Sequence, residues 1–220
     1  SELSASEEAL TAYLKAKELV RETSDRDLEA RINNHLGTLY WENGRTEKSL
    51  SCYKEAYRNY EMEQNKIGMT NTLRNIGKSM HGLEKLDSAY FYLDRAFVFA
   101  KNENLESQMA YILSSMGSIY AEKGLYEKAL AYQKESLNYS RIQNTKSSCY
   151  YAIGESYVNI QKLDSALLYV DSALMSKDLY VKCSANWLLY TICLKKQDYK
   201  KACTYNERYL LLRDSIEQVY

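Results

Sequence analysis

The sequence predicts an all-α fold built from a repeated helical unit of about 40 residues. Three observations support this prediction. Gly37, Gly77, Gly117 and Gly154 recur in the same local context, at spacings of 40, 40 and 37 residues. Small residues recur in the same register with the spacing of one helix face. The 220 residues include 8 glycines and no proline, whereas a hairpin-rich fold needs such turn residues.

Three columns of residues define the packing face of each unit. The first column holds Ala9, Ser49, Ala89, Ala129, Ala166 and Ala202. The third column, seven residues later, holds Ala16, Ala56, Ala96, Ser136, Ala173 and Tyr209. The middle column holds Tyr13, Tyr53, Leu93, Gln133, Val170 and Asn206. The i, i+4, i+7 spacing is one face of an α-helix, and small residues on that face let another helix cross closely.

The expected elements follow in order from this register. A first helix is expected over residues 5–22, with Ser4 and Glu7 as a capping box at its start. Five helix pairs are expected after it, over residues 28–43 and 46–62, 67–82 and 85–102, 106–122 and 125–141, 147–160 and 163–176, and 181–195 and 198–217. Gly44 and Gly124 are expected to end the first helix of their pairs. Polar residues 64–66, 101–104, 143–145 and 176–178 are expected to form the turns between pairs.

The unit resembles the tetratricopeptide repeat. The resemblance rests on a glycine flanked by aliphatic residues, a tyrosine three residues later, as in Gly37 and Tyr40, and an Ala-x3-aromatic-x2-Ala helix. It implies a right-handed α-solenoid of about eleven helices, stacked as antiparallel helix pairs in one domain over residues 1–220. The implied repeats cover about residues 28–62, 67–102, 106–141, 147–176 and 181–217, after the lone helix at 5–22. The long unit without a closing proline is similar to the repeats of LGN-like adaptors and Rap-type bacterial peptide receptors.

Composition and motifs exclude several function classes. The 29 basic and 29 acidic residues balance, which removes the cationic surface that a nucleic-acid binder needs. The apolar runs are too short to cross a membrane. The five cysteines show no C-x-x-C spacing, so no metal site is indicated. His35 and His81 lie in different repeats and share no catalytic motif, and no phosphate-binding glycine motif occurs. We therefore expect no catalytic, cofactor-binding or metal-binding residue, and no enzyme activity.

A stack of helix pairs has a long concave surface, lined mostly by the first helix of each pair. In the family that the repeats resemble, residues three before and one after the glycine column face this groove. Together with neighbours on the same stripe, the candidates for partner binding are Arg31, Asn34, Thr38, Trp41, Asn71, Arg74, Asn75, Lys78, Tyr111, Ser114, Tyr151 and Trp187.

The stripe is cationic and amide-bearing at its N-terminal part and aromatic at its C-terminal part. Arginine can hold a carboxylate with two hydrogen bonds, and asparagine can bond both N–H and C=O groups of an extended peptide. This layout suits a protein or peptide segment with an acidic end and an apolar end. Two alternatives stay open: the polar residues are merely solvated, and Trp41 and Trp187 pack in the core rather than anchor a ligand.

The C-terminal residues 209–216 continue the last helix with apolar side chains, which predicts self-association or continuation of the array through this helix. The stretch is similar to the end of repeat domains in bacterial membrane-anchored regulators. That resemblance implies the sensor or scaffold part of a larger signalling or transcription regulator, outside the cytoplasm. The start at Ser1 without methionine suggests a trimmed piece. The alternative is a stand-alone cytoplasmic adaptor or peptide receptor.

Overall fold

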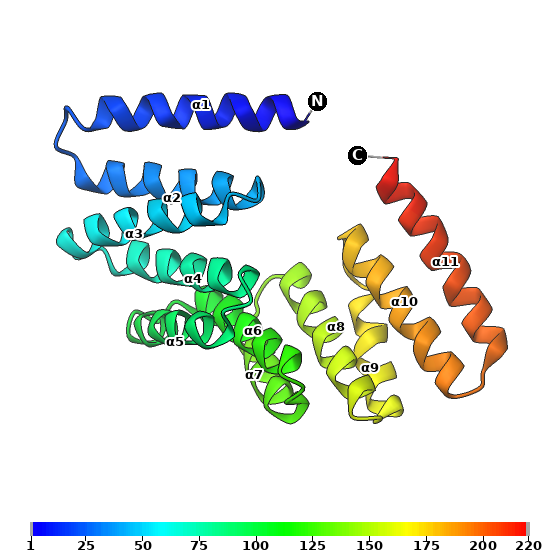
Figure 1. Ribbon diagram of the computed structural model, residues 1–220. Coiled ribbons are helices and arrows are strands. Elements are labelled where there is room, and N and C mark those ends of the chain that lie inside the picture. The colour runs from blue at the N-terminus through cyan, green and yellow to red at the C-terminus, as the bar shows by residue number, and fades with distance from the viewer. Residues whose placement is uncertain (1, 219–220) are drawn as a thin grey trace. The chain divides into compact units, whose positions relative to one another are not determined.

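The computed structural model describes the backbone of residues 2–218 and the side chains of residues 7–218. Over that backbone the chain forms eleven α-helices and no strand, so the predicted all-α class is confirmed (Figure 1). The helices are α1 (Glu2–Val20), α2 (Arg26–Glu42), α3 (Thr46–Met62), α4 (Lys66–Gly82), α5 (Leu86–Asn102), α6 (Glu106–Glu122), α7 (Tyr126–Tyr139), α8 (Gln143–Asn159), α9 (Leu163–Ala173), α10 (Leu179–Lys195) and α11 (Tyr199–Glu217).

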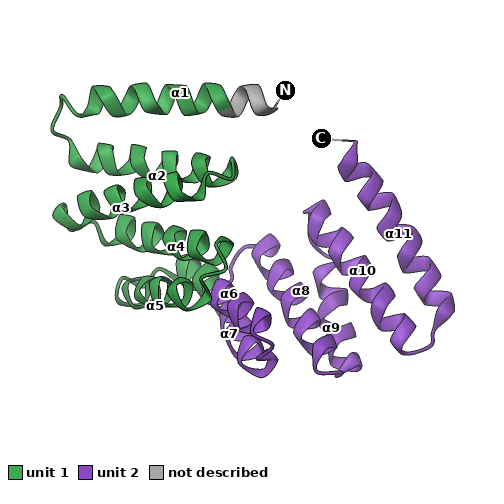
Figure 2. Ribbon diagram, in the orientation of Figure 1, with its two compact units in different colours: residues 1–112 green, residues 113–220 purple. Residues whose placement is uncertain are grey.

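The chain divides into two compact units, which are unit 1 over residues 1–112 and unit 2 over residues 113–220 (Figure 2). In unit 1, α2 packs on α3 and α4 packs on α5, and α3 also packs on α4. In unit 2, α8 packs on α9 and α10 on α11, and α9 also packs on α10. Each unit is therefore a stack of helix pairs, which confirms the predicted α-solenoid class. One continuous domain over residues 1–220 stays a prediction.

Seven of the turns between helices share one geometry. The second turn residue is left-handed, with φ between 52° and 71°, at Gly44, Gln64, Glu84, Asn104, Gly124, Gln161 and Gln197. The N–H of the next residue donates to the carbonyl five positions earlier, as Arg45 does to Tyr40 at 2.7 Å. This is the Schellman arrangement, which satisfies carbonyls that the helix end leaves without partners. The predicted helix-ending role of Gly44 and Gly124 is confirmed.

The expected helix bounds differ from the observed ones most at two places. Helix α8 begins at Gln143, so the turn expected at residues 143–145 is wrong: those residues form the first turn of the helix. The turn lies at residues 140–142 instead, because Ser140 and Ile142 are extended. Helix α1 begins at Glu2, which puts Ser4 inside the helix rather than at its start, and the Ser4 side chain lies outside the described residues.

The glycine column marks the close crossing within each pair, as predicted. A Cβ added to Gly77 would lie 2.8 Å from Leu93 Cγ, and one added to Gly37 would lie 2.5 Å from the Tyr53 ring. Each glycine thus meets the middle-column residue sixteen positions later. Both small columns are fully buried in the interior repeats, as at Ala89 and Ala96. Helix packing at this separation leaves no room for a larger residue.

Helix α11 presents few buried residues, and Ala202 is the buried one among those described for it. Leu210 and Leu211 are exposed, and Ile216 is half-buried. Tyr209 takes the place that alanine or serine holds in the other repeats, and its ring lies 5.1 Å from that of Trp187. Self-association or continuation through this helix stays a prediction.

Candidate functional site

A polar cluster on α2 and α4 of unit 1 brings together several of the predicted groove residues. Asn75 Nδ2 donates to Asn34 Oδ1 at 3.3 Å, and Thr72 Oγ1 donates to the same oxygen at 3.4 Å. Arg74 Nη2 donates to Asn75 Oδ1 at 3.3 Å. The register puts these side chains on one stripe because Asn34 and Arg74 both stand three residues before a column glycine. The chain Arg74–Asn75–Asn34 orders two amides that can also bond a ligand.

Two cations of this cluster lie on aromatic rings. The Lys78 ammonium lies 4.7 Å from the centre of the Trp41 ring, and the Arg74 guanidinium lies 5.8 Å from the centre of the Tyr111 ring. The face of an aromatic ring carries negative charge density, so both contacts are attractive. Trp41 is 38% exposed and therefore does not pack in the core. The rings hold the cations in place, and the Glu42 carboxylate compensates part of the charge of Lys78.

The charge balance of the cluster is strongly positive for its burial. Burial lowers the pKa of the Arg74 guanidinium, and burial together with nearby Arg74 lowers the pKa of Lys78. Arg74 Nε is buried with no hydrogen-bond partner. Among the described side chains, neither cation forms an ion pair with a carboxylate. The Glu42 carboxylate acts on Lys78 in the direction that raises its pKa, so the cluster holds two cations against this one carboxylate.

A small cavity of about 80 Å³ opens beside Lys78. It is lined by Thr38, Trp41, Glu42, Tyr53, Asn75, Lys78 and Ser79. Thr38 Oγ1 lies 3.1 Å from the Tyr53 hydroxyl at its wall, and burial raises the pKa of that hydroxyl. The hydroxyls and the Asn75 amide give the cavity both donors and acceptors, as a site for a polar group needs.

Some predicted residues of unit 1 stand outside the cluster. Arg31 is exposed, and its charge acts on the hydroxyl of Tyr60. Asn71 is half-buried on α4. Arg31 and Asn71 extend the stripe toward the start of each helix. The structure brings together seven of the predicted residues, which are Asn34, Thr38, Trp41, Arg74, Asn75, Lys78 and Tyr111.

The remaining predicted residues lie in unit 2. Tyr151 donates to Glu155 Oε1 at 3.1 Å, and burial raises the pKa of its hydroxyl. Trp187 is half-exposed and its ring lies 5.3 Å from that of Tyr190. Ser114 accepts on its carbonyl from the Ser118 hydroxyl. Since Trp187 also contacts Tyr209 of α11, it holds the last helix pair together whatever its role in binding.

Sequence reasoning missed the partners of these groups. Thr38 pairs with Tyr53, a middle-column residue that had been assigned to packing alone. The contact of Lys78 with Trp41 joins residues 37 positions apart, one unit minus three residues, so the repeat register contains this signal. His35 stacks on Tyr13 of α1 with ring centres 5.4 Å apart, which gives that histidine a packing contact.

Among the described residues, no group of three or more His, Cys, Asp or Glu side chains is placed to hold a metal ion. Within the same part of the chain, every helix is too short or too polar to cross a bilayer.

The family comparison gives two matches. A family model described as the tetratricopeptide repeat matches residues 3–62, and a second model with the same description matches residues 110–142. Comparison with curated protein sequences gave no match.

Solved structures give a broad likeness of fold. BtubC (BKLC) from P. vanneervenii is 19% identical with a TM-score of 0.83, covering 97% of this chain and 92% of that chain. Aspartyl phosphate phosphatase F from Bacillus subtilis is 17% identical with a TM-score of 0.77, covering 93% and 65%. The Rap conjugation gene regulator of the plasmid pLS20, in complex with the Phr* peptide, is 15% identical with a TM-score of 0.73, covering 98% and 71%. At these identities the likeness concerns the fold alone.

Proposed function

We propose, from the premise that the chain is a tetratricopeptide-repeat protein, that it is a non-enzymatic module that binds a protein or peptide segment. The proposed segment lies along the first helices of the repeats and places an anionic group against Arg74 and Lys78. One observation carries this proposal: half-buried Arg74 and exposed Lys78 both lie on aromatic rings, and neither forms an ion pair in the described part of the chain.

An anionic side chain fits this place for electrostatic reasons. Two like charges near each other in a partly desolvated site repel, and an anion between them relieves that repulsion. The guanidinium of Arg74 can hold a carboxylate or phosphate with two hydrogen bonds. Asn34 and Asn75 supply amide groups for the backbone of an extended peptide. The likeness to a Rap regulator solved with a peptide supports the same kind of partner.

The aromatic half of the predicted stripe belongs to the same proposal. Within unit 1, Tyr111 would contact an apolar residue of a partner. Within unit 2, Tyr151 and Trp187 would do the same. Large, partly exposed rings are the residues that contribute most to protein interfaces. Trp187 also packs against Tyr209.

The wider context is also a proposal. We infer the sensor or scaffold part of a larger bacterial regulator, acting outside the cytoplasm and binding no nucleic acid. The second candidate is a stand-alone cytoplasmic adaptor or peptide receptor, which the likeness to the Rap proteins favours. Sequencing the whole gene separates the two, since the first requires a translocation signal and an output domain.

Calorimetry with a synthetic peptide of about ten residues, acidic at one end and apolar at the other, tests the site. Replacing both cations, Arg74→Ala with Lys78→Ala, should weaken binding about 100-fold, since each charged hydrogen bond contributes about 1.5–3 kcal/mol. Lys128→Ala is the matched control: Lys128 lies over the Tyr120 ring at 5.6 Å but outside the cluster, and its removal should leave affinity unchanged. Unchanged affinity in a folded double variant overturns the assignment.

A further inference from the structure

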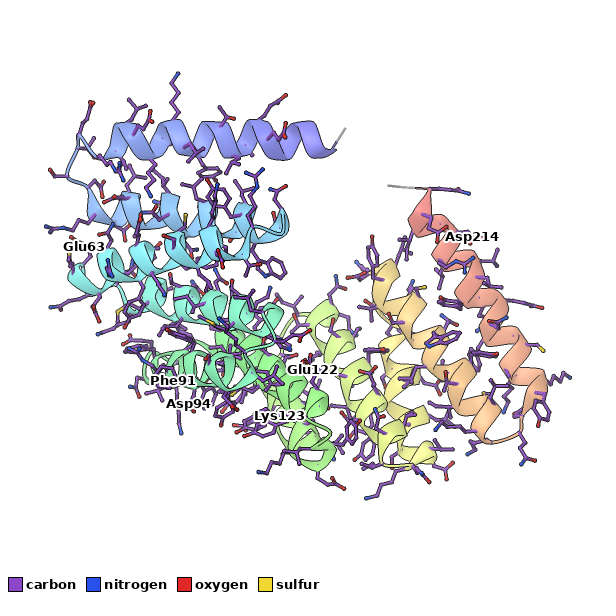
Figure 3. All side chains as sticks on the ribbon, viewed as in Figure 1. Glu63, Phe91, Asp94, Glu122, Lys123 and Asp214 are labelled. Atoms are coloured by element: carbon purple, nitrogen blue, oxygen red, sulfur yellow. The ribbon has the colours of Figure 1, made fainter. Side chains whose placement is uncertain are left out.

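The outer faces of α5 and α9 carry the same pattern of exposed residues. Each has an aspartate four residues before a large apolar side chain, a second aspartate three residues after it, and another apolar side chain four residues further on. On α5 these residues are Asp87, Phe91, Asp94 and Val98. The second copy has Asp164, Leu168 and Asp171 on α9, and Met175 in the turn that follows this helix. Figure 3 labels Phe91 and Asp94 on α5. One copy of the pattern belongs to each unit.

The apolar members of this pattern are unusually open to solvent. Phe91 is 56% exposed and Val98 is 51% exposed, while Leu168 is 70% and Met175 is 72% exposed. Packing does not require them, because the equivalent positions of α3 hold Ser51 and Arg58, both exposed and polar. Helix α7 likewise holds Ala131 and Asn138 there. Paired exposed apolar residues without a packing role indicate an interaction surface.

The central aspartate of each pattern gives the surface its charge. Asp94 and Asp171 form no ion pair in the described part of the chain. The neighbouring Arg95 donates to the Tyr57 hydroxyl at 3.1 Å, and its guanidinium lies over the Tyr57 and Phe91 rings, 5.7 Å and 5.8 Å from their centres, without pairing with Asp94. Asp164 at the edge of the α9 pattern already pairs with Lys196. Partial burial raises the pKa of Asp171, as expected of a carboxylate beside apolar side chains.

The equivalent position on the intervening helices has the opposite charge. Lys54 of α3 and Lys134 of α7 stand where α5 and α9 have Asp94 and Asp171, and both lysines are exposed. Helix α11 has Glu207 at this position, so the acidic residue is shared by α5, α9 and α11 and absent from α3 and α7. A basic residue of a partner would be attracted to α5 and α9 and repelled by α3 and α7.

We propose that α5 and α9 each bind a basic amphipathic helix of another protein, which sets two apolar side chains beside a central lysine or arginine. Residues seven apart on a helix are two turns, or about 10.5 Å, apart, so a partner helix with apolar residues at i and i+7 matches the spacing of Phe91 and Val98. A cation between them meets the central aspartate. A second copy of this chain matches less well, because its cationic faces on α3 and α7 lack large apolar residues.

Calorimetry with a synthetic helix of about 18 residues, with leucines at i and i+7 and lysines between them, tests the proposal. The chain should bind two peptides. Phe91→Ala with Val98→Asn gives α5 the residues of α7, and Leu168→Ala with Met175→Asn does the same for α9. Each pair should remove one site, and the four substitutions together should remove both. All four positions are exposed, so the variants should fold.

Two further variants in the same calorimetry test the charge and the specificity of peptide binding. Asp94→Lys with Asp171→Lys should weaken binding about tenfold, or about 1.4 kcal/mol. Arg74→Ala with Lys78→Ala should leave this peptide's affinity unchanged, which separates this surface from the groove of the proposed function. Equal binding of a peptide with glutamates in place of lysines overturns the proposal. So does unchanged affinity of the fourfold variant for the lysine peptide. A third contradicting outcome is self-association of the chain through these faces, abolished in the fourfold variant.

Discussion

Unit 1 and unit 2 use the same helix pair but join their pairs differently. Within pairs, the turns are alike in both units, with a left-handed second residue at Gly44, Glu84, Gly124, Gln161 and Gln197. Between pairs, unit 1 repeats that same turn at Gln64 and Asn104. Unit 2 does not: an extended turn at residues 140–142 and a longer connection at 174–178 join its pairs.

This difference accounts for the change in repeat length along the sequence. In unit 1, helices of 17 residues alternate with turns of three, which gives the 40-residue period. In unit 2, α7 has 14 residues and α9 has 11, and both shortenings fall in the second helix of a pair. The packing inside a pair is thus fixed by the glycine crossing, while the joint between pairs tolerates change.

The largest expected contrast concerns the glycine crossings of the two units. Gly154→Ala in unit 2 brings a Cβ into Val170 Cγ2, and valine has one preferred rotamer in a helix. Gly77→Ala in unit 1 meets Leu93, which has more freedom to move. Urea unfolding should show a loss of about 2–3 kcal/mol for Gly154→Ala and about 1–2 kcal/mol for Gly77→Ala.

A double-mutant cycle checks that the clash is the cause. In a Val170→Ala background, Gly154→Ala should cost much less than in the native chain, because the overlapping methyl group is gone. Equal costs in both backgrounds would show that the two crossings do not differ in the way described.

The next contrast concerns the cations of the two units. Arg74→Met in unit 1 should raise the free energy of unfolding by about 1 kcal/mol in the absence of ligand, because a partly buried charge without a counter-ion is replaced by an apolar chain. Lys134→Met in unit 2 should change it by less than about 0.5 kcal/mol, since solvent screens this exposed lysine.

The pH dependence of unfolding, compared between the native chain and the Lys134 variant, tests the sign of the Lys134 contribution to folding stability. A hydrogen bond to the Tyr157 hydroxyl raises the pKa of Lys134, so the folded chain holds this proton more tightly than the unfolded chain. The resulting stability is complete below the unfolded pKa of about 10.4 and is lost as pH rises through the folded pKa. The difference between native chain and variant should therefore vanish at high pH; a difference that grows with pH contradicts this account.

The smallest contrast concerns glycine substitutions in the two kinds of turn, which should change the free energy of unfolding in opposite directions. Glu84→Gly should stabilise the chain by about 0.5–1 kcal/mol, because a side chain at φ 58° is strained and glycine is not. Ser140→Gly should destabilise it by about 1 kcal/mol, since Ser140 is extended and its hydroxyl donates to the Ser136 carbonyl. Thermal unfolding monitored by circular dichroism measures both, and a gain at Ser140 would mean that its turn is left-handed in solution.

The sequence predicted most of the helix bounds because a 40-residue period superimposes several copies of the same signal. It also predicted a close helix crossing at the glycine column, but the partners of Gly37 and Gly77, which are Tyr53 and Leu93, came from the structure. It failed at residues 143–145, where polar residues suggested a turn. Such residues also suit the first turn of a helix, and only the extended backbone of Ser140 decides between the two.

The site was predictable as a stripe of residues but not as a set of contacts. The register placed Arg74 and Lys78 on one face, yet their rings, Tyr111 and Trp41, depend on how neighbouring helices are rotated against each other. The lack of an ion pair at Arg74 among the described side chains could not be foreseen either, because it depends on which carboxylates fail to reach its guanidinium. Periodicity describes one helix at a time, whereas charge compensation is a property of their packing.

The repeated turn geometry has a consequence for the rate of folding. Its second residue has a positive φ and its third residue must donate an N–H, so proline fits at neither position. Helix interiors exclude proline as well, and the chain contains none. The unfolded chain therefore has no X–Pro bonds to isomerise, and its refolding should lack the phase of tens to hundreds of seconds that such bonds impose.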